Sequence, residues 1–224
     1  MTLFRSYISA TLCIGCALHQ VASFSPTSSQ PMHSKTAQYA LAAPELSIPN
    51  IFESKDARRT RLKKDILELA SETKRGLTVT DEQRQEMDRL FVQLEALNPT
   101  PNPLKKPGVN GDWSLDYTTS DSILGKGGFP RVGPIIQNID TTTLSAKNSE
   151  VVRYAVINVP RSVSAELSPV NGQFTNVKFK KFMLGPIGFD APDSFVGSLD
   201  ITYLDEELRL TRGDKGNIFV LTRM

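Results

Sequence analysis

Cysteine and histidine are nearly absent from this sequence. The chain has 224 residues, and its two Cys and two His all lie near the N-terminus, at Cys13, Cys16, His19 and His33. The rest of the chain therefore offers no disulfide, no zinc site of the usual Cys/His type, no thiol nucleophile and no histidine base. A Gly-x-Ser-x-Gly nucleophile elbow is also missing. We expect no catalytic residue, no metal and no cofactor, and a protein that is not an enzyme, although carboxylates such as Asp200 leave room for one.

Acidic residues are missing from the first part of the chain. The first acid is Glu45, and the only strong bases before it are Arg5 and Lys35. The whole chain has 26 Lys and Arg against 24 Asp and Glu, so the part from Glu45 onward is electrically neutral. Binding to nucleic acid needs clustered positive charge, because the phosphates supply most of the affinity. We therefore expect no nucleic-acid partner.

Residues 1–23 and 24–44 have the composition of two successive targeting signals. In residues 1–23 a basic residue precedes a mostly apolar stretch that is too short to span a bilayer, and small residues suited to cleavage follow, as in a secretory signal peptide. Residues 24–44 are rich in Ser, Thr, Ala and Pro, as in a transit peptide. The junction around Phe24 resembles the bipartite presequences of algae with secondary plastids. We predict import into a plastid. The alternative is a secreted protein with a disordered N-terminus, which the absence of an Asn-x-Ser/Thr acceptor disfavours.

Residues 54–98 carry the period of two amphipathic helices. Apolar side chains recur at helical spacing in two stripes, formed by Leu62, Ile66, Leu69 and Thr73 and by Met87, Leu90, Phe91, Leu94 and Leu97. Gly76 can end the first helix, and Thr80 with Gln83 forms a capping box at the start of the second. We expect a helical hairpin whose stripes dock on the sheet domain. Contact of its basic residues with anionic lipid is the alternative.

Residues 110–224 are almost wholly β in pattern, and a stiff Pro-rich connector, 99–109, precedes them. In the first strand Trp113, Leu115 and Tyr117 alternate with polar residues, so we expect these three side chains to share one face of a sheet. About eight short strands are expected in all.

The turns between the later strands carry signals of different strength. Asn171-Gly172 is the strongest hairpin signal in the chain. Ile123–Pro134 and Pro186–Pro192 are rich in Gly and Pro and are predicted to be loops. Val151–Val159 is apolar on both faces and is predicted to be a buried strand.

Antiparallel strands without intervening helices form a sandwich or a barrel, and closure into a barrel removes the exposed edges. We predict a mainly β protein with an antiparallel barrel after the helical hairpin. The residues expected in the barrel interior, where they would bind a ligand, are Trp113, Leu115, Tyr117, Val177, Phe179, Leu199, Ile201, Tyr203, Leu208 and Leu210. For each of them, a place in a packed core is the alternative.

Gly111-x-Trp113 on the first strand also resembles the Gly-x-Trp signature of lipocalins. There the indole closes one barrel end, and a basic side chain from the last strands stacks on it. Arg209 or Arg212 could provide this cation, in a cation–π contact of about 1 kcal/mol. The alternative is that both arginines face solvent.

Three segments resemble motifs of one family. They are the strand Gly111–Ser120, the long C-terminal stretch Leu199–Leu221, and Leu94–Pro101 before the barrel. The family is that of the plastid lipid-associated proteins, or PAP/fibrillin family, and the resemblance runs from about Lys55 to the C-terminus. It implies a lipocalin-like barrel in the plastid, association with plastoglobules or thylakoids, and binding or carriage of carotenoids, quinones, tocopherols or fatty acids.

Two hypotheses follow for the function. In the first, the protein carries a small apolar molecule inside its barrel and meets a lipid globule or thylakoid surface peripherally, without a transmembrane segment in the mature chain. In the second, the barrel is packed solid and the protein is a structural coat of plastid lipid globules, touching lipid through its apolar loops or its helices.

Overall fold

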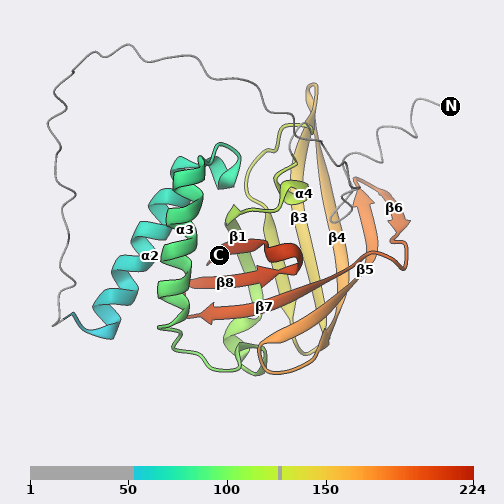
Figure 1. Ribbon diagram of the computed structural model, residues 1–224. Coiled ribbons are helices and arrows are strands. Elements are labelled where there is room, and N and C mark those ends of the chain that lie inside the picture. Colours follow the sequence, from blue (N-terminus) through green and yellow to red (C-terminus); the bar gives the residue numbers. More distant parts are fainter. Residues whose placement is uncertain (1–52, 126–127) are drawn as a thin grey trace, which may run out of the picture.

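The computed structural model describes residues 53–125 and 128–224 (Figure 1), so both predicted targeting segments lie outside the described residues. The helices are α2 (Lys55–Glu72), α3 (Asp81–Glu95) and α4 (Asp121–Leu124), with the 3₁₀ turns η1 (Lys74–Gly76), η2 (Pro103–Lys105), η3 (Pro107–Val109) and η4 (Asp214–Gly216). The strands are β1 (Gly111–Thr118), β2 (Ile136–Asp140), β3 (Ser145–Tyr154), β4 (Ile157–Pro169), β5 (Phe174–Leu184), β6 (Ile187–Asp190), β7 (Val196–Leu204), β8 (Leu208–Gly213) and β9 (Ile218–Arg223).

The strands form one antiparallel sheet that closes on itself. The order along the sheet is β4-β3-β2-β1-β9-β8-β7-β5-β6, and an additional pairing of β4 with β5 closes the barrel. Strand β6 lies outside this circle and pairs only with β5. The prediction of a lipocalin-like antiparallel barrel preceded by a helical hairpin is confirmed.

Helices α2 and α3 lie side by side against one outer face of the barrel (Figure 1). Ser54 caps α2, and Thr80 with Gln83 forms the expected capping box on α3. Helix α2 ends at Glu72, before Gly76, which stands at a φ of 97° in the following turn. The stripe residues pack with outward-facing side chains of β1, β7, β8 and β9 in one cluster, which buries Leu62, Ile66, Ala70, Met87, Leu90, Phe91, Leu94, Tyr117, Tyr203, Leu208, Leu210, Ile218 and Val220.

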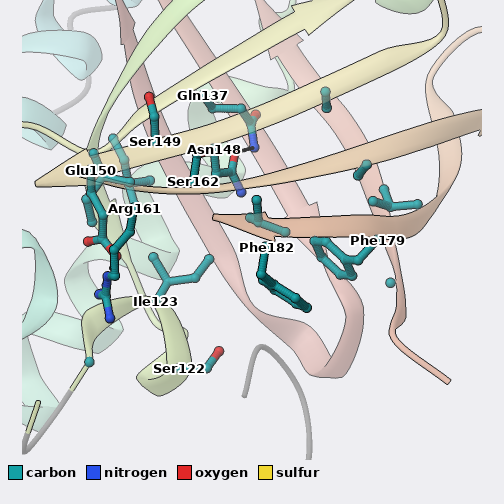
Figure 2. Close-up of a pocket in the computed structure, with 18 of the residues that line it drawn as sticks. Ser122, Ile123, Gln137, Asn148, Ser149, Glu150, Arg161, Ser162, Phe179 and Phe182 are labelled. Atoms are coloured by element: carbon teal, nitrogen blue, oxygen red, sulfur yellow. Dashed lines mark hydrogen bonds and ion pairs between the residues drawn. The ribbon is translucent and has the colours of Figure 1, made fainter. Parts of the chain in front are cut away.

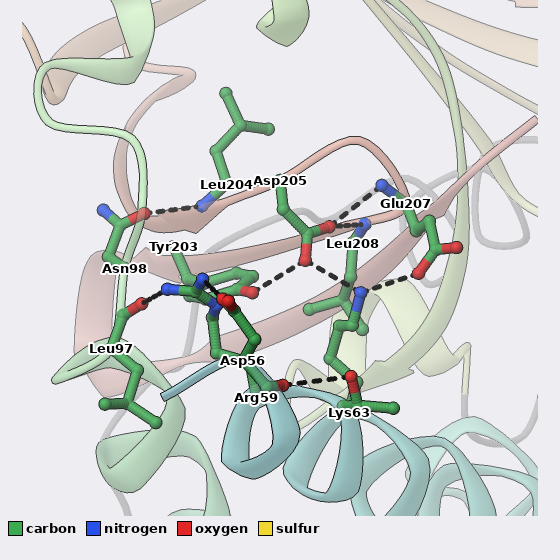
Figure 3. Close-up of polar contacts among 11 residues, drawn as sticks. Asp56, Arg59, Lys63, Leu97, Asn98, Tyr203, Leu204, Asp205, Glu207 and Leu208 are labelled. Carbon is green, nitrogen blue, oxygen red and sulfur yellow. Dashed lines mark hydrogen bonds and ion pairs between the residues drawn. The ribbon is translucent and has the colours of Figure 1, made fainter. Parts of the chain in front are cut away.

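A polar contact fastens α2 to the turn between β7 and β8 (Figure 3). The Lys63 ammonium lies 2.9 Å from Asp205 Oδ2 and 2.6 Å from Glu207 Oε2. The same Asp205 oxygen accepts a 2.7 Å hydrogen bond from the Tyr203 hydroxyl, and Asp205 Oδ1 accepts from the backbone amides of Glu207 and Leu208. One carboxylate therefore orders the turn and the helix that covers it.

A β-bulge in β1 and another in β7 each change which face of the sheet the following side chains occupy. The pairing of β1 with β9 shifts between Leu115 and Tyr117, and that of β7 with β8 shifts between Ile201 and Tyr203. An extra residue in one strand of a pair reverses the face taken by the side chains after it. Leu115 and Ile201 therefore belong to the interior cluster of the barrel, whereas Tyr117 and Tyr203 belong to the helix-facing cluster.

Two expectations for the later strands are wrong. Pro186–Pro192 is not only a loop, because Ile187–Asp190 forms β6. Val151–Val159 is not one buried strand, because the chain turns back between β3 and β4 and leaves Val156 93% exposed at the tip. The apolar residues on both faces of this segment had predicted burial, but Val156 is an apolar side chain on the surface. None of the helices in residues 53–125 and 128–224 is long and apolar enough to cross a membrane.

Candidate functional site: the barrel cavity

The barrel encloses a cavity of about 710 Å³. Its walls are mostly apolar and come from strands all around the barrel, with Leu115, Ile135, Ala146, Val163, Ala165, Val177, Phe179, Phe182, Leu199, Phe219 and Leu221. Two small residues widen one wall of the cavity, since Ala146 of β3 and Ala165 of β4 both line it and pair with each other in the register. Pockets for small molecules commonly measure roughly 300–1,000 Å³, so this cavity is large enough for one apolar ligand.

One end of the barrel is closed by its connector and by Trp113. The turns η2 and η3 put Leu104 and Val109 into the interior cluster, and the indole nitrogen of Trp113 donates a 3.0 Å hydrogen bond to the Val109 carbonyl. The guanidinium carbon of Arg209 lies 4.9 Å from the indole ring centroid and that of Arg223 lies 4.1 Å from it. The indole thus lies next to two cations.

Of the two arginines proposed to stack on Trp113, the structure places Arg209 there. Arg212 lies on the helix side instead, over the Phe91 ring and in an ion pair of 2.7 Å with Glu95. Arg223, which the sequence reasoning missed, is the second cation at the indole. It is the residue next to the C-terminal Met224, and its partner across the register is Trp113 itself.

Arg209 is fully buried, and burial together with the nearby Arg223 lowers the pKa of its guanidinium to about 9. Its Nη2 donates a hydrogen bond to Gln137 Oε1. Its other two nitrogens, Nε and Nη1, meet no hydrogen-bond partner among the described residues. At neutral pH it remains a cation, held next to the interior of the barrel without a carboxylate partner in the described part of the chain.

The opposite end of the cavity opens to solvent. Phe129, Phe189 and Val196 line the cavity and are also exposed, by 38%, 43% and 60%. The tip of the β3–β4 hairpin, with Val156, lies at the same end (Figure 1). Apolar side chains therefore form part of the rim of the opening.

A polar cluster holds α4 beside the opening. Glu150 forms ion pairs with Arg131 and with Arg161, the latter at 2.5 Å. Arg131 also donates hydrogen bonds to the carbonyls of Ile123 and Leu124 in α4. Figure 2 shows Glu150 and Arg161 side by side, with Ile123 close to them. Glu150, Arg131 and Arg161 together keep one net positive charge near the open end of the cavity.

The ten residues expected in the interior divide between the two sides of the barrel wall. Leu115, Val177, Phe179 and Leu199 line the cavity, and Trp113 and Ile201 belong to the interior cluster. The interior placement of the other four is corrected, because the structure packs Tyr117, Tyr203, Leu208 and Leu210 against α2 and α3. The bulges explain the two tyrosines. Leu210 pairs with Tyr203 across the register, so it shares the outer face, and Leu208 lies two residues before it.

Several lining residues could not be found from the sequence pattern. Gln137 and Asn148 are polar residues that face the interior from β2 and β3, and they pair directly with each other. In β2 and β3 apolar residues do not alternate regularly with polar ones, so the sequence does not indicate which side chains face the interior of the barrel.

These features define a lipocalin-like β-barrel that has a helical cover on one outer face and an internal apolar cavity with an open mouth. The PAP_fibrillin family model matches residues 60–190 and 185–222, which is most of the described chain. The chain belongs to the PAP/fibrillin family, and the resemblance found in its motifs is confirmed.

Curated relatives are named as plastid proteins. The chain is 38% identical over 171 residues to "Probable plastid-lipid-associated protein 5, chloroplastic" of Arabidopsis thaliana, an alignment that covers 75% of this chain and 70% of the relative. It is 29% identical over 241 residues to "Probable plastid-lipid-associated protein 2, chloroplastic" of the same plant, covering 82% and 76%. It is 28% identical over 217 residues to "Plastoglobulin-1, chloroplastic" of Pisum sativum, covering 72% and 60%. No solved structure matches the chain. The predicted plastid localisation is confirmed by these relatives.

Proposed function

We propose that this protein binds one small apolar molecule in its barrel cavity and delivers it to, or holds it at, the lipid globules or thylakoid surface of the plastid. The observation that carries the proposal is the apolar cavity of about 710 Å³ with one closed and one open end. Each 100 Å² or so of apolar ligand surface buried there contributes about 2.5 kcal/mol. Carotenoids, quinones, tocopherols and fatty acids are the ligand classes considered, and none of them needs a catalytic group.

The same opening supports peripheral contact with lipid. Val156, Ile157, Ile187, Phe189 and Val196 are exposed by 93%, 64%, 56%, 43% and 60%. Exposed apolar side chains gathered at one end of a molecule mark a surface that meets another apolar surface. A relative is named plastoglobulin, which favours a lipid globule as that surface. Docking by this end would place the cavity mouth directly on the lipid.

A non-enzymatic role fits the residues of the site. Histidine and cysteine are absent from the described residues, and in them no group of three His, Cys, Asp or Glu side chains could hold a metal ion. Relatives carry names that describe lipid association. We propose a binding protein whose mechanism is desolvation of its ligand.

A structural coat is the second candidate, and the exposed apolar end is the observation that favours it. A coat needs that end but no hollow barrel. The two functions are separated by filling the cavity without changing the surface.

The test is the variant Ala146→Phe, which replaces a small side chain of the cavity wall by a ring, with Ala57→Phe on the exposed side of α2 as its matched control. Both proteins are expressed with a plastid lipid extract, examined by native mass spectrometry, and floated with lipid droplets. A carrier loses its bound ligand in Ala146→Phe and keeps it in Ala57→Phe. If no variant ever carries a ligand and all of them float with droplets, the coat is correct. Circular dichroism checks that both variants fold.

A further inference from the structure

We propose that the cavity selects ligands that carry a carbonyl oxygen, because a relay of side chains that starts at Arg209 ends in a hydrogen-bond donor, Asn148 Nδ2, on the cavity wall. This inference rests on the proposed function and names the chemistry of the ligand's polar group. It assigns Asn148 and Gln137 as the residues that determine specificity in a mostly apolar site.

The relay consists of two hydrogen bonds. Arg209 donates from Nη2 to Gln137 Oε1, and Gln137 Nε2 donates to Asn148 Oδ1 over 3.1 Å. Gln137 of β2 and Asn148 of β3 are direct partners in the sheet register, so the backbone fixes their separation. Figure 2 shows the two amides joined on one wall of the cavity.

The guanidinium sets the direction of the relay. Arginine has five N–H donors and no acceptor, so the Gln137 atom that faces it must be the amide oxygen. The Gln137 amide nitrogen then points to Asn148 and requires the Asn148 oxygen as its acceptor. The Asn148 Nδ2 group is what remains, and it donates to no residue in the described part of the chain. A reversed amide at either position would leave two donors or two acceptors facing each other.

The surroundings of this donor are mixed. Ser149, Glu150 and Ser162 line the cavity close to Asn148 in sequence or register, whereas on the β4 side its partner Val163 is followed across the sheet by Phe182 of β5. Asn148 is half-buried, so solvent reaches this N–H group in the empty cavity. An apolar ligand that fills the cavity displaces that solvent, and leaving a desolvated donor unpaired costs about 1–3 kcal/mol. A ligand with an oxygen at this point removes that cost, and a hydrocarbon does not.

The charge behind the relay strengthens the preference. Arg209 is fully buried and makes no ion pair within residues 53–125 and 128–224. The other charged group at the Trp113 ring is the guanidinium of Arg223, which is also positive and so does not neutralise Arg209. An uncompensated positive charge in a medium of low dielectric polarises the hydrogen bonds that start from it. The donor at the end of the chain therefore favours oxygens with high negative charge, such as those of ketones, quinones, esters and carboxylates.

The experiment compares two probes that differ only in the carbonyl. One is the ketone 6-dodecanoyl-2-dimethylaminonaphthalene, and the other is its 6-dodecyl analogue, in which a methylene replaces the carbonyl. Binding to the protein is followed by fluorescence. We expect the ketone to bind about fivefold to tenfold more tightly than the analogue, the worth of one buried hydrogen bond. In Asn148→Leu, which has nearly the same shape, the preference should disappear, because the analogue no longer leaves a donor unpaired and binds more tightly than it does to the wild type.

Two further variants test the relay itself. Arg209→Met keeps Asn148 but removes the cation, so the ketone preference should fall without being lost. Asn176→Leu replaces an exposed asparagine on the outside of β5 and should change nothing. The infrared carbonyl stretch of ¹³C-labelled ketone gives a readout that a merely structural role would not move. It should lie at lower wavenumber in the wild-type complex than in Asn148→Leu.

Competition with palmitate and with methyl palmitate separates the two sources of such an oxygen. Displacement of the ketone by both supports a neutral carbonyl as sufficient, and displacement by palmitate alone supports the inference with a carboxylate as the natural group. Equal binding of ketone and methylene analogue, unchanged in Asn148→Leu, overturns the inference and leaves the proposed function standing. Failure of the wild type to bind either probe or any plastid lipid overturns both.

Discussion

The carboxylate of Asp205 is the main polar contact between α2 and the barrel, through Lys63. Replacing it by asparagine keeps the shape and one oxygen, which can still accept from the amides of Glu207 and Leu208. The substitution removes the negative charge that faces Lys63 at 2.9 Å, and it places an amide where the Tyr203 hydroxyl donates at 2.7 Å. Hydrogen bonds to charged groups are worth about 1.5–3 kcal/mol. We therefore expect Asp205→Asn to lower the free energy of unfolding by about 2 kcal/mol at pH 7.

The effect should depend on pH with a definite sign. Burial alone would raise the pKa of the Asp205 carboxyl, but hydrogen bonds from Tyr203, Lys63 and two backbone amides lower that pKa below its ordinary value. A carboxyl with a lowered pKa in the folded state contributes stability above its unfolded pKa, near ~3.9, and loses that contribution as the pH falls through the folded pKa. The difference between wild type and Asp205→Asn should therefore be constant from pH 7 to about 5 and shrink as the pH falls further.

Urea denaturation at a series of pH values measures this difference. Glu207→Gln is the matched control, because Glu207 also pairs with Lys63, at 2.6 Å, but its side chain is 78% exposed. An exposed ion pair contributes about 1 kcal/mol or less. Equal losses in the two variants, or a loss in Asp205→Asn that stays the same down to pH 2, would refute the reasoning that burial and the shared hydrogen bonds make Asp205 special.

Three further predictions concern the packing of the helices on the barrel. Phe91→Ala removes a fully buried ring between α3 and the barrel, and calorimetry should show a loss of about 3–5 kcal/mol. Gly76→Ala should lower the free energy of unfolding, measured by urea denaturation, more than Gly133→Ala does. Both glycines have a positive φ, but only at Gly76 would a Cβ meet the backbone carbonyl of Thr118. Equal losses of stability would argue against this close approach. Thr80→Ala breaks the capping box of α3 and should cost about 1 kcal/mol, and a smaller melting shift than Phe91→Ala is expected.

The sequence allowed the elements to be predicted better than the faces of the strands. The capping box at Thr80, the hairpin turn at Asn171 and the stacking of Arg209 or Arg212 on Trp113 were expected from local chemistry or from one motif. The structure contains the first two, and of the two arginines it places Arg209 on the indole. The inward face of β1 and β7 was predicted from strict alternation. A bulge is a property of a strand pair, so alternation within one strand gives no sign of it, and Tyr117 was placed on the wrong side for that reason.

The polar residues of the cavity could not be predicted from the sequence for a different reason. Gln137 and Asn148 are ordinary strand residues in sequence, and only their register brings them together and beside Arg209. A charged residue at position 209 among leucines was expected either to face solvent or to stack on the indole. That it is buried without a carboxylate partner in the described residues follows from closure of the barrel, which no local pattern encodes.

The central claim is that the barrel is a container for a ligand. Native mass spectrometry of the protein purified after expression with a plastid lipid extract tests it most directly, with Ala146→Phe and Ala57→Phe measured beside the wild type. The account predicts one bound lipid or pigment per chain in the wild type and in Ala57→Phe, and the mass of the bare chain in Ala146→Phe. A bare mass for the wild type, or a ligand that stays bound in Ala146→Phe at the same stoichiometry, would contradict the account.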